Sequence, residues 1–249
     1  MVFKTINLNK SYNQPNSKNL DVLNSLNLEV NEGEFVCLLG PTGCGKTTLL
    51  RILSLLEKPS GGEVIHSHKK LSYVFQQGAL FPWMSVIDNV CFPLRARGMA
   101  KKRSKLIASE MLNSVGLGDF SQNYPHELSG GMQQRTALAR GLVTEPDLLL
   151  LDEPFASLDE KTSFRLQDML RKLCNTFSTS VVFVTHNIEE AVYLADRIVV
   201  MGSKGGSIAR NEDINLPWPR NRLSTEFTDT LLSFRQTFEE LVDFSISSS

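Results

Sequence analysis

Short apolar runs alternate with helical patterns along this chain. The runs are rich in aliphatic and β-branched residues and cover residues 2–8, 35–39, 71–75, 148–151, 181–185 and 197–201. Several of them, LLLL and VVFV for instance, would be apolar on both faces of a strand. Such strands are typical of the middle of a sheet that helices cover on both sides, so the pattern predicts an α/β core with a largely parallel sheet.

Other segments repeat their apolar residues at helical spacing. Ile107, Met111 and Val115 recur every four residues, and similar repeats occupy residues 166–177 and 227–241. Each repeat predicts a helix with one apolar face, and the last one a helix that packs on the core or on a partner. The stretch from about residue 78 to 135 has helical patterns but no strong strand, which indicates an α-helical lobe inserted into the α/β core.

Composition narrows the class of protein. The 249 residues, 41% apolar and 21% charged, suffice for a domain with a sizeable core and differ from a disordered chain. The formal net charge of -1 gives no reason to expect nucleic acid as a partner. Cys37, Cys44, Cys91 and Cys174 have neither CxxC nor metal-ligand spacing, so we expect reduced thiols. The sequence has no signal peptide and no apolar run long enough to span a membrane, so we expect a cytoplasmic protein.

A glycine-rich loop follows the apolar strand FVCLL and precedes the helical start TTLLRIL. It fits the pattern GxxxxGK[ST] with Gly40, Pro41, Thr42, Gly43, Cys44, Gly45, Lys46 and Thr47. In this context the backbone N–H groups of the loop and the N-terminus of the helix bind phosphate groups. We expect Lys46 to reach the β- and γ-phosphates of ATP, Thr47 to bind Mg²⁺ and Thr48 to contact the α-phosphate. The alternative is a glycine-rich turn with an incidental lysine.

Two carboxylates end the buried run LLLL. Asp152 and Glu153 follow it directly, at the carboxyl edge of the predicted sheet, where nucleotide sites lie in α/β proteins. Asp152 can hold Mg²⁺, and Glu153 can polarise the water that attacks the γ-phosphate. A strand followed by a charged turn is the common alternative, but it becomes improbable beside the phosphate loop.

The string LSGGMQQR distinguishes between the families that share these two motifs. It spans residues 128–135, stands before the helical pattern TALARGLV, and contains Ser129, Gly130, Gly131 and Gln133. The string resembles the signature motif of ATP-binding cassette (ABC) proteins, and the motifs of the whole chain follow the order of that family. The resemblance implies that these four residues contact ATP. It also implies a homodimer on ATP binding, in which the signature of one chain presses on the γ-phosphate held by the phosphate loop of the other. Taken alone, LSGG could be an ordinary helix N-cap.

Further positions match the family. Tyr12 resembles the aromatic residue that stacks on adenine, and Gln76 resembles the glutamine that touches Mg²⁺ and senses the membrane subunit, although Gln77 could take that place instead. Residues 157–159 resemble the loop that crosses the dimer interface. His186, at the end of the run VVFVT, resembles the histidine that contacts the γ-phosphate.

The resemblance also implies a fold and an activity. It predicts an α/β protein with a P-loop NTPase core of the ABC ATPase type, a small antiparallel β subdomain and an inserted α-helical subdomain. We expect a single nucleotide-binding domain whose parts cover about residues 1–77 and 136–225 (core), 78–135 (helical subdomain) and 225–244 (C-terminal helix). ATP hydrolysis is expected to depend on Lys46, Glu153 and His186, and Mg²⁺ binding on Thr47, Gln76 and Asp152.

The transporter class is indicated by two further stretches. FQQGALFPWMSVIDNV and NLPWPRNRLSTEF resemble the ATPase subunits that energise uptake of nitrate, alkanesulfonates, taurine and related solutes. The resemblance implies transmembrane permease subunits, an extracytoplasmic solute-binding protein and a place at the inner face of the cell membrane. Three alternatives remain: an importer ATPase for another solute, a soluble ABC ATPase of DNA repair or translation, and a nucleotide sensor without turnover. The presence of Glu153 argues against the sensor.

Two expectations concern single side chains. Phe81, Pro82 and Trp83 are expected to form part of a groove that receives a helix of the membrane subunit, because aromatic residues are enriched at interfaces. The alternative is that Trp83 closes the core of the helical lobe. Cys44 is expected to be the most reactive cysteine, because Lys46 and the N-terminus of a helix favour its thiolate, whereas Cys37 is expected to be buried.

Overall fold

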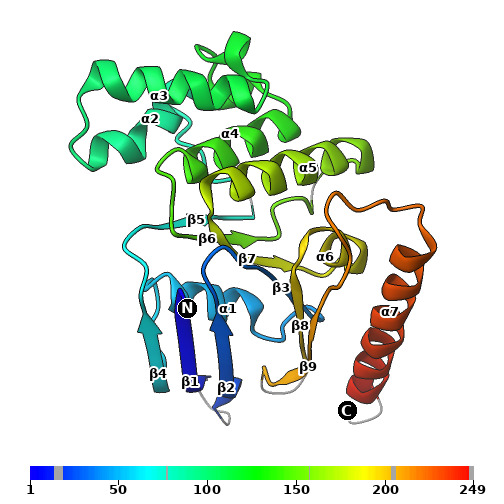
Figure 1. The fold of residues 1–249 in the computed structure, drawn as a ribbon. Helices are drawn as coiled ribbons and strands as arrows, with labels where there is room; N and C mark the ends of the chain where they lie inside the picture. The colour runs from blue at the N-terminus through cyan, green and yellow to red at the C-terminus, as the bar shows by residue number, and fades with distance from the viewer. Residues whose placement is uncertain (14–18, 77, 157, 203–205, 247–249) are drawn as a thin grey trace. The chain divides into compact units, whose positions relative to one another are not determined.

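The computed structural model describes residues 1–13, 19–76, 78–156, 158–202 and 206–246 (Figure 1). Two compact units make up the chain. The first combines Met1–His68 with Ser180–Ser249, and the second is Lys69–Thr179. Among the described residues, no helix is long and apolar enough to cross a membrane.

The first unit contains a small antiparallel sheet. It has the strand order β2-β1-β4, where β1 is Phe3–Tyr12, β2 is Leu20–Val30 and β4 is Gly61–His66. Alternate apolar residues of β1 and β2, among them Phe3, Leu8 and Leu26, are buried, as expected for a sheet with one face on a core. The expected antiparallel subdomain is therefore present.

A second group of strands in this unit has the order β7-β3-β8-β9. Three strands run parallel: β3 (Phe35–Leu39), β7 (Ser180–Thr185) and β8 (Arg197–Met201), while β9 (Ile208–Asp213) is antiparallel to β8. Every residue of β3 and β7 is buried. This explains why both read as uninterrupted apolar runs, and it confirms the predicted parallel core.

Helices α1 (Lys46–Leu53), α6 (Ile188–Leu194) and α7 (Thr225–Ile246) complete the first unit. The C-terminal helix α7 buries Phe227 and Phe234, and the guanidinium of Arg210 on β9 lies 4.1 Å from the Phe234 ring centroid. Before α7, buried Arg220 donates hydrogen bonds of 2.6 and 3.1 Å to the carbonyls of Val192 and Tyr193 at the end of α6. Packing on the core, one of the two modes expected for this helix, is confirmed.

The second unit holds two parallel strands and most of the helices. Its strands are β5 (Leu71–Val74) and β6 (Leu148–Asp152), and its helices are α2 (Val86–Ala96), α3 (Lys101–Ser114), α4 (Gly130–Leu142) and α5 (Glu160–Phe177), with short 3₁₀ turns η1 (Gly118–Phe120) and η2 (Pro125–Glu127). Helix α2 starts where the Ser85 side chain accepts a hydrogen bond from the Asp88 N–H. Helices α2, α3 and α4 pack on one another, although most of α4 lies beyond residue 135, where the helical lobe was expected to end.

Candidate functional site

The phosphate loop joins the end of β3 to the start of α1. Gly43 and Gly45 have φ angles of +83° and +100°, a left-handed conformation that favours glycine. A Cβ on Gly45 would lie 2.9 Å from both the Val22 carbonyl oxygen and a Leu23 methyl, so no larger residue fits there, whereas the space beside Gly43 is open. No side chain caps α1, so its N-terminal turn can accept an external anion.

The side chain of Lys46 bends back over this loop. Its Nζ donates hydrogen bonds to the carbonyls of Gly40 at 2.7 Å and Pro41 at 2.9 Å, and the residue is only 5% exposed. A buried ammonium requires such partners because the loss of its hydration is costly. The cation is therefore held inside the loop that the sequence assigns to phosphate.

Two other expected residues of the first unit can be placed relative to this loop. Leu39 on β3 pairs with Thr185 on β7, so Gly40 and exposed His186 follow neighbouring parallel strands at the same edge. Tyr12 pairs with Leu20 on β2, the strand that contacts Gly45 through Val22 and Leu23. The half-exposed ring of Tyr12 has the ammonium of Lys10 at 4.9 Å from its centroid.

In the second unit, the acidic pair lies where β6 ends. Asp152 is 7% exposed and its Oδ2 accepts a hydrogen bond of 2.9 Å from the Tyr73 hydroxyl on β5. Glu153 has φ of +45°, a left-handed conformation that costs a residue with a side chain about 1–2 kcal/mol. Gln76 follows β5 and is exposed, while Gln77 and Ser157 lie outside the described residues.

The signature residues form the N-terminus of α4. Ser129 is the N-cap, and its hydroxyl accepts a hydrogen bond of 3.4 Å from the Met132 N–H. Gly130 is exposed with open space where a Cβ would stand, so a ligand can approach the first turn closely. The Gln133 amide instead donates to the carbonyls of Pro125 and Leu128, at 2.9 and 3.3 Å, and so holds the segment that precedes the helix.

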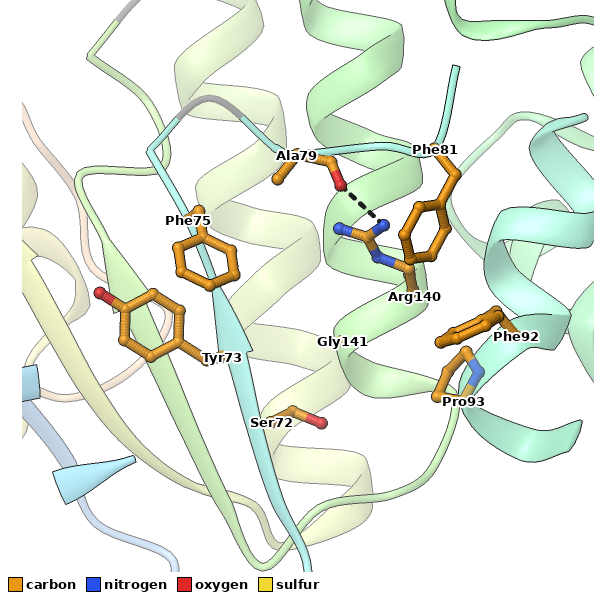
Figure 2. Close-up of a pocket in the computed structure, with 9 residues that line it drawn as sticks. All are labelled: Ser72, Tyr73, Phe75, Ala79, Phe81, Phe92, Pro93, Arg140 and Gly141. Atoms are coloured by element: carbon orange, nitrogen blue, oxygen red, sulfur yellow. Dashed lines mark hydrogen bonds between the residues drawn. The ribbon is translucent and has the colours of Figure 1, made fainter. Parts of the chain in front are cut away.

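A groove with a cavity of about 380 Å³ lies in the second unit (Figure 2). We call it the Phe81 groove; its lining residues are Ser72, Tyr73, Phe75, Ala79, Phe81, Phe92, Pro93, Arg140 and Gly141. Arg140 on α4 donates to the carbonyls of Gly78 at 2.7 Å and Ala79 at 2.9 Å, which fixes the segment after β5. Sequence reasoning missed Tyr73 and Arg140, since neither belongs to a recognisable pattern.

Trp83 stands beside this groove. Its ring centroid is 5.6 Å from that of Phe81, and the residue is 70% exposed. A residue that closed the core of the helical lobe would be buried, so that alternative is wrong.

The expectation for Cys44 is also wrong. Its side chain is 2% exposed, and a Cβ on Gly40 would lie only 2.8 Å from its Sγ, which shows that the thiol packs against the loop backbone. Burial raises the pKa of Cys44, and this effect exceeds the opposing influence of Lys46. Cys91 and Cys174 are buried as well, and the expected burial of Cys37 is confirmed.

Comparison with known proteins identifies the family. The family model described as ABC transporter matches residues 23–156, more than half of the chain. The chain belongs to the ABC transporter family. It is 44% identical over 233 residues to an uncharacterized ABC transporter ATP-binding protein of Methanocaldococcus jannaschii, covering 91% of this chain and 87% of that protein. It is 39% identical to the aliphatic sulfonates import ATP-binding protein SsuB of Bacillus cereus, covering 92% of each.

Solved structures support the same family assignment. The dimeric structure of the ATP-binding cassette MJ0796, in a post-hydrolysis state bound to ADP and phosphate, has 34% sequence identity and a TM-score of 0.77, over 86% of this chain and 99% of that one. The ABC ATPase fold expected from the motifs is confirmed. The chain is therefore an ABC transporter ATP-binding subunit with ATPase activity.

The residues present fit ATP and a divalent cation. The loop offers open space at Gly43, an uncapped helix N-terminus and a buried ammonium. Among the described residues, no cluster of three or more His, Cys, Asp or Glu side chains could hold a metal by itself. A metal at the phosphate loop would therefore depend on oxygen ligands such as the Thr47 hydroxyl together with phosphate oxygens, which is how Mg²⁺ is usually bound.

Proposed function

We propose that this chain powers an importer of a small anion or solute of the nitrate, sulfonate and taurine class. Similarity to SsuB over 92% of both chains supports this proposal more than any other observation, since that relative is named for import of aliphatic sulfonates. The stretches FQQGALFPWMSVIDNV and NLPWPRNRLSTEF also support the proposal, because they resemble the ATPase subunits of importers of this class. An importer of another solute is the remaining candidate, since specificity belongs to the membrane and binding proteins.

Each proposed catalytic residue has a distinct role in ATP hydrolysis. Bound Mg-ATP supplies the phosphoryl group that is transferred to water, with the metal screening its charge. Lys46 stabilises negative charge on the phosphates, and Thr47, Asp152 and Gln76 would be the residues that hold the metal. Glu153 orients the attacking water and accepts its proton, while His186 contacts the γ-phosphate.

The rest of the nucleotide is proposed to be held by the loop and by a second chain. Tyr12 stacks on adenine, and the loop backbone from Gly40 to Gly45 cradles the phosphates. Ser129, Gly130 and Gly131 of the opposite chain complete the site through the first turn of α4. Gln133 contributes indirectly, because its amide holds the segment that precedes α4. The dimeric cassettes among the structural relatives support a dimer, and the head-to-tail arrangement follows from the resemblance of the signature motif.

We also propose that the Phe81 groove receives a helix of the permease at the inner face of the membrane. Phe81, Phe92 and Pro93 provide an apolar lining, and exposed Trp83 stands beside it (Figure 2). An aromatic residue next to an apolar cavity is typical of an interface hot spot. An extracytoplasmic binding protein would then deliver the solute to the permease.

Reconstitution tests the substrate class. The chain is assembled with its permease in proteoliposomes, and phosphate release is measured with the binding protein loaded with ethanesulfonate, taurine, nitrate, sulfate or maltose. We expect stimulation by one or more of the first three solutes only. Stimulation by maltose or by sulfate alone would contradict the proposed class. If the isolated chain has full ATPase activity and no permease binds to it, the result would favour a non-transport ABC ATPase.

A further inference from the structure

The register of β5 and β6 places Tyr73 over the proposed metal ligand. Tyr73 pairs with Leu150 in the parallel ladder, and Asp152 stands two residues further along β6, on the same face as Leu150. A tyrosine is long enough to reach such a diagonal neighbour. Its hydroxyl donates a hydrogen bond of 2.9 Å to Oδ2 of Asp152.

This hydrogen bond constrains a buried carboxylate. Asp152 is 7% exposed, and a hydrogen bond to an ionised carboxylate is about twice as strong as one between neutral groups. A carboxylate that binds Mg²⁺ must present its oxygens in one orientation. A neighbouring residue that hydrogen-bonds to the metal ligand commonly fixes that orientation. We propose that Tyr73 is a positioning residue for ATP hydrolysis: its hydroxyl orients the Asp152 carboxylate toward Mg²⁺. This inference rests on the metal role proposed above for Asp152.

The same tyrosine is connected to the Phe81 groove. Its ring centroid lies 4.4 Å from that of Phe75, which is 41% exposed and lines the groove. Figure 2 shows the two rings side by side, with the Tyr73 hydroxyl pointing away from Phe81 and Arg140. A permease helix in the groove would contact Phe75. Through Phe75 it could shift the ring of Tyr73, whose hydroxyl is hydrogen-bonded to Asp152. The Phe75, Tyr73 and Asp152 side chains form a contiguous path from the partner surface to the metal ligand.

Tyr73→Phe tests the positioning role, because it removes the hydroxyl and keeps the ring. The concentration of Mg²⁺ that half-saturates ATPase activity should rise about tenfold, as expected for loss of one hydrogen bond to a charged group. A fluorescent ATP analogue gives a readout without turnover. Its affinity in Mg²⁺ should fall by a similar factor, while its affinity in EDTA stays unchanged. Tyr124→Phe removes a hydroxyl from an exposed tyrosine and serves as the matched control, with wild-type behaviour in both assays.

The outcomes separate this inference from the proposed function. Wild-type Mg²⁺ dependence and nucleotide affinity in Tyr73→Phe would overturn the positioning role, even if the variant melts at a lower temperature. Asp152→Asn is run in parallel: if it keeps wild-type Mg²⁺ dependence, the metal role of Asp152 fails, and the role of Tyr73 fails with it. Phe75→Leu tests the path to the groove. It should reduce the stimulation of ATPase activity by the permease, and unchanged stimulation would overturn this path.

Discussion

Lys46 donates a hydrogen bond of 2.7 Å to the carbonyl oxygen of Gly40, the residue that opens its own phosphate loop. A second hydrogen bond joins the same ammonium to the Pro41 carbonyl at 2.9 Å. The lysine therefore has two functions: it carries the positive charge proposed to stabilise phosphate, and it holds the two ends of the loop together. A substitution should affect both nucleotide binding and the stability of the fold.

We expect Lys46→Ala to lower the free energy of unfolding by about 1–3 kcal/mol, because buried carbonyls lose a charged donor. ATP affinity should fall as well. Urea unfolding and a nucleotide titration measure the two effects, with Lys105→Ala, an exposed lysine of α3, as the control that should change neither. Unchanged unfolding of Lys46→Ala would show that its hydrogen bonds contribute nothing to the loop.

Glu153→Gln should preserve ATP binding and reduce turnover by at least about 10²-fold, because the amide cannot accept the proton of the attacking water. Steady-state phosphate release from the subunit assembled with its permease measures the effect. Glu160→Gln, at the first residue of α5, is a matched control for the loss of one carboxylate. Release near the wild-type rate would exclude Glu153 as the base.

The Glu153→Gln variant also isolates the ATP-bound dimer, since it binds nucleotide without consuming it. Light scattering should detect monomers without ATP and dimers with it, because Ser129 of one chain completes the site of the other in the proposed arrangement. Adding Ser129→Arg should abolish the dimer by filling the space at the first turn of α4. Equal dimer populations with and without ATP would contradict this arrangement.

The parts of the fold that could be predicted are those where burial is complete. Strands β3, β6 and β7 are buried at every residue, so their apolar runs stood out. Strand β9 was missed, because its sequence IARNED is largely exposed and forms a strand only through pairing with β8. The sequence likewise predicted the phosphate loop, since the residues that shape it are neighbours along the chain.

Interactions between distant residues could not be predicted in this way. Tyr73 and Asp152 are 79 residues apart, and their hydrogen bond depends on the register of two strands. The error at Cys44 has the same origin. Its neighbours along the chain favour a thiolate, but the packing of the loop backbone around Sγ decides its exposure.

Trp83→Ala should abolish permease-stimulated ATPase activity and transport while leaving the isolated subunit folded. The side chain is 70% exposed, so its removal should change the free energy of unfolding by less than about 0.5 kcal/mol. Leu106→Ala removes an apolar side chain that is 62% exposed on α3 and should leave coupling intact. Thermal unfolding and reconstituted transport separate the two properties. A variant that unfolds, or one that transports at the wild-type rate, would argue against Trp83 as a permease contact.

Cys44 should resist alkylation in the folded protein. Its thiol is buried, and burial raises its pKa above the ordinary value, so at pH 8 less thiolate is present than in the unfolded chain. Because the raised pKa keeps the proton on sulfur, the labelling rate of the folded protein should also begin to rise at a higher pH than that of the unfolded chain. We expect iodoacetamide to modify Cys44 at least about tenfold more slowly in buffer than in 6 M urea, because the reaction requires local opening. Peptide mapping by mass spectrometry measures each of the four cysteines, and Cys44→Ser identifies the peptide. Faster labelling of Cys44 in the folded protein than in urea would show that the loop exposes an activated thiolate, and the local influence of Lys46 and the helix N-terminus would then outweigh burial.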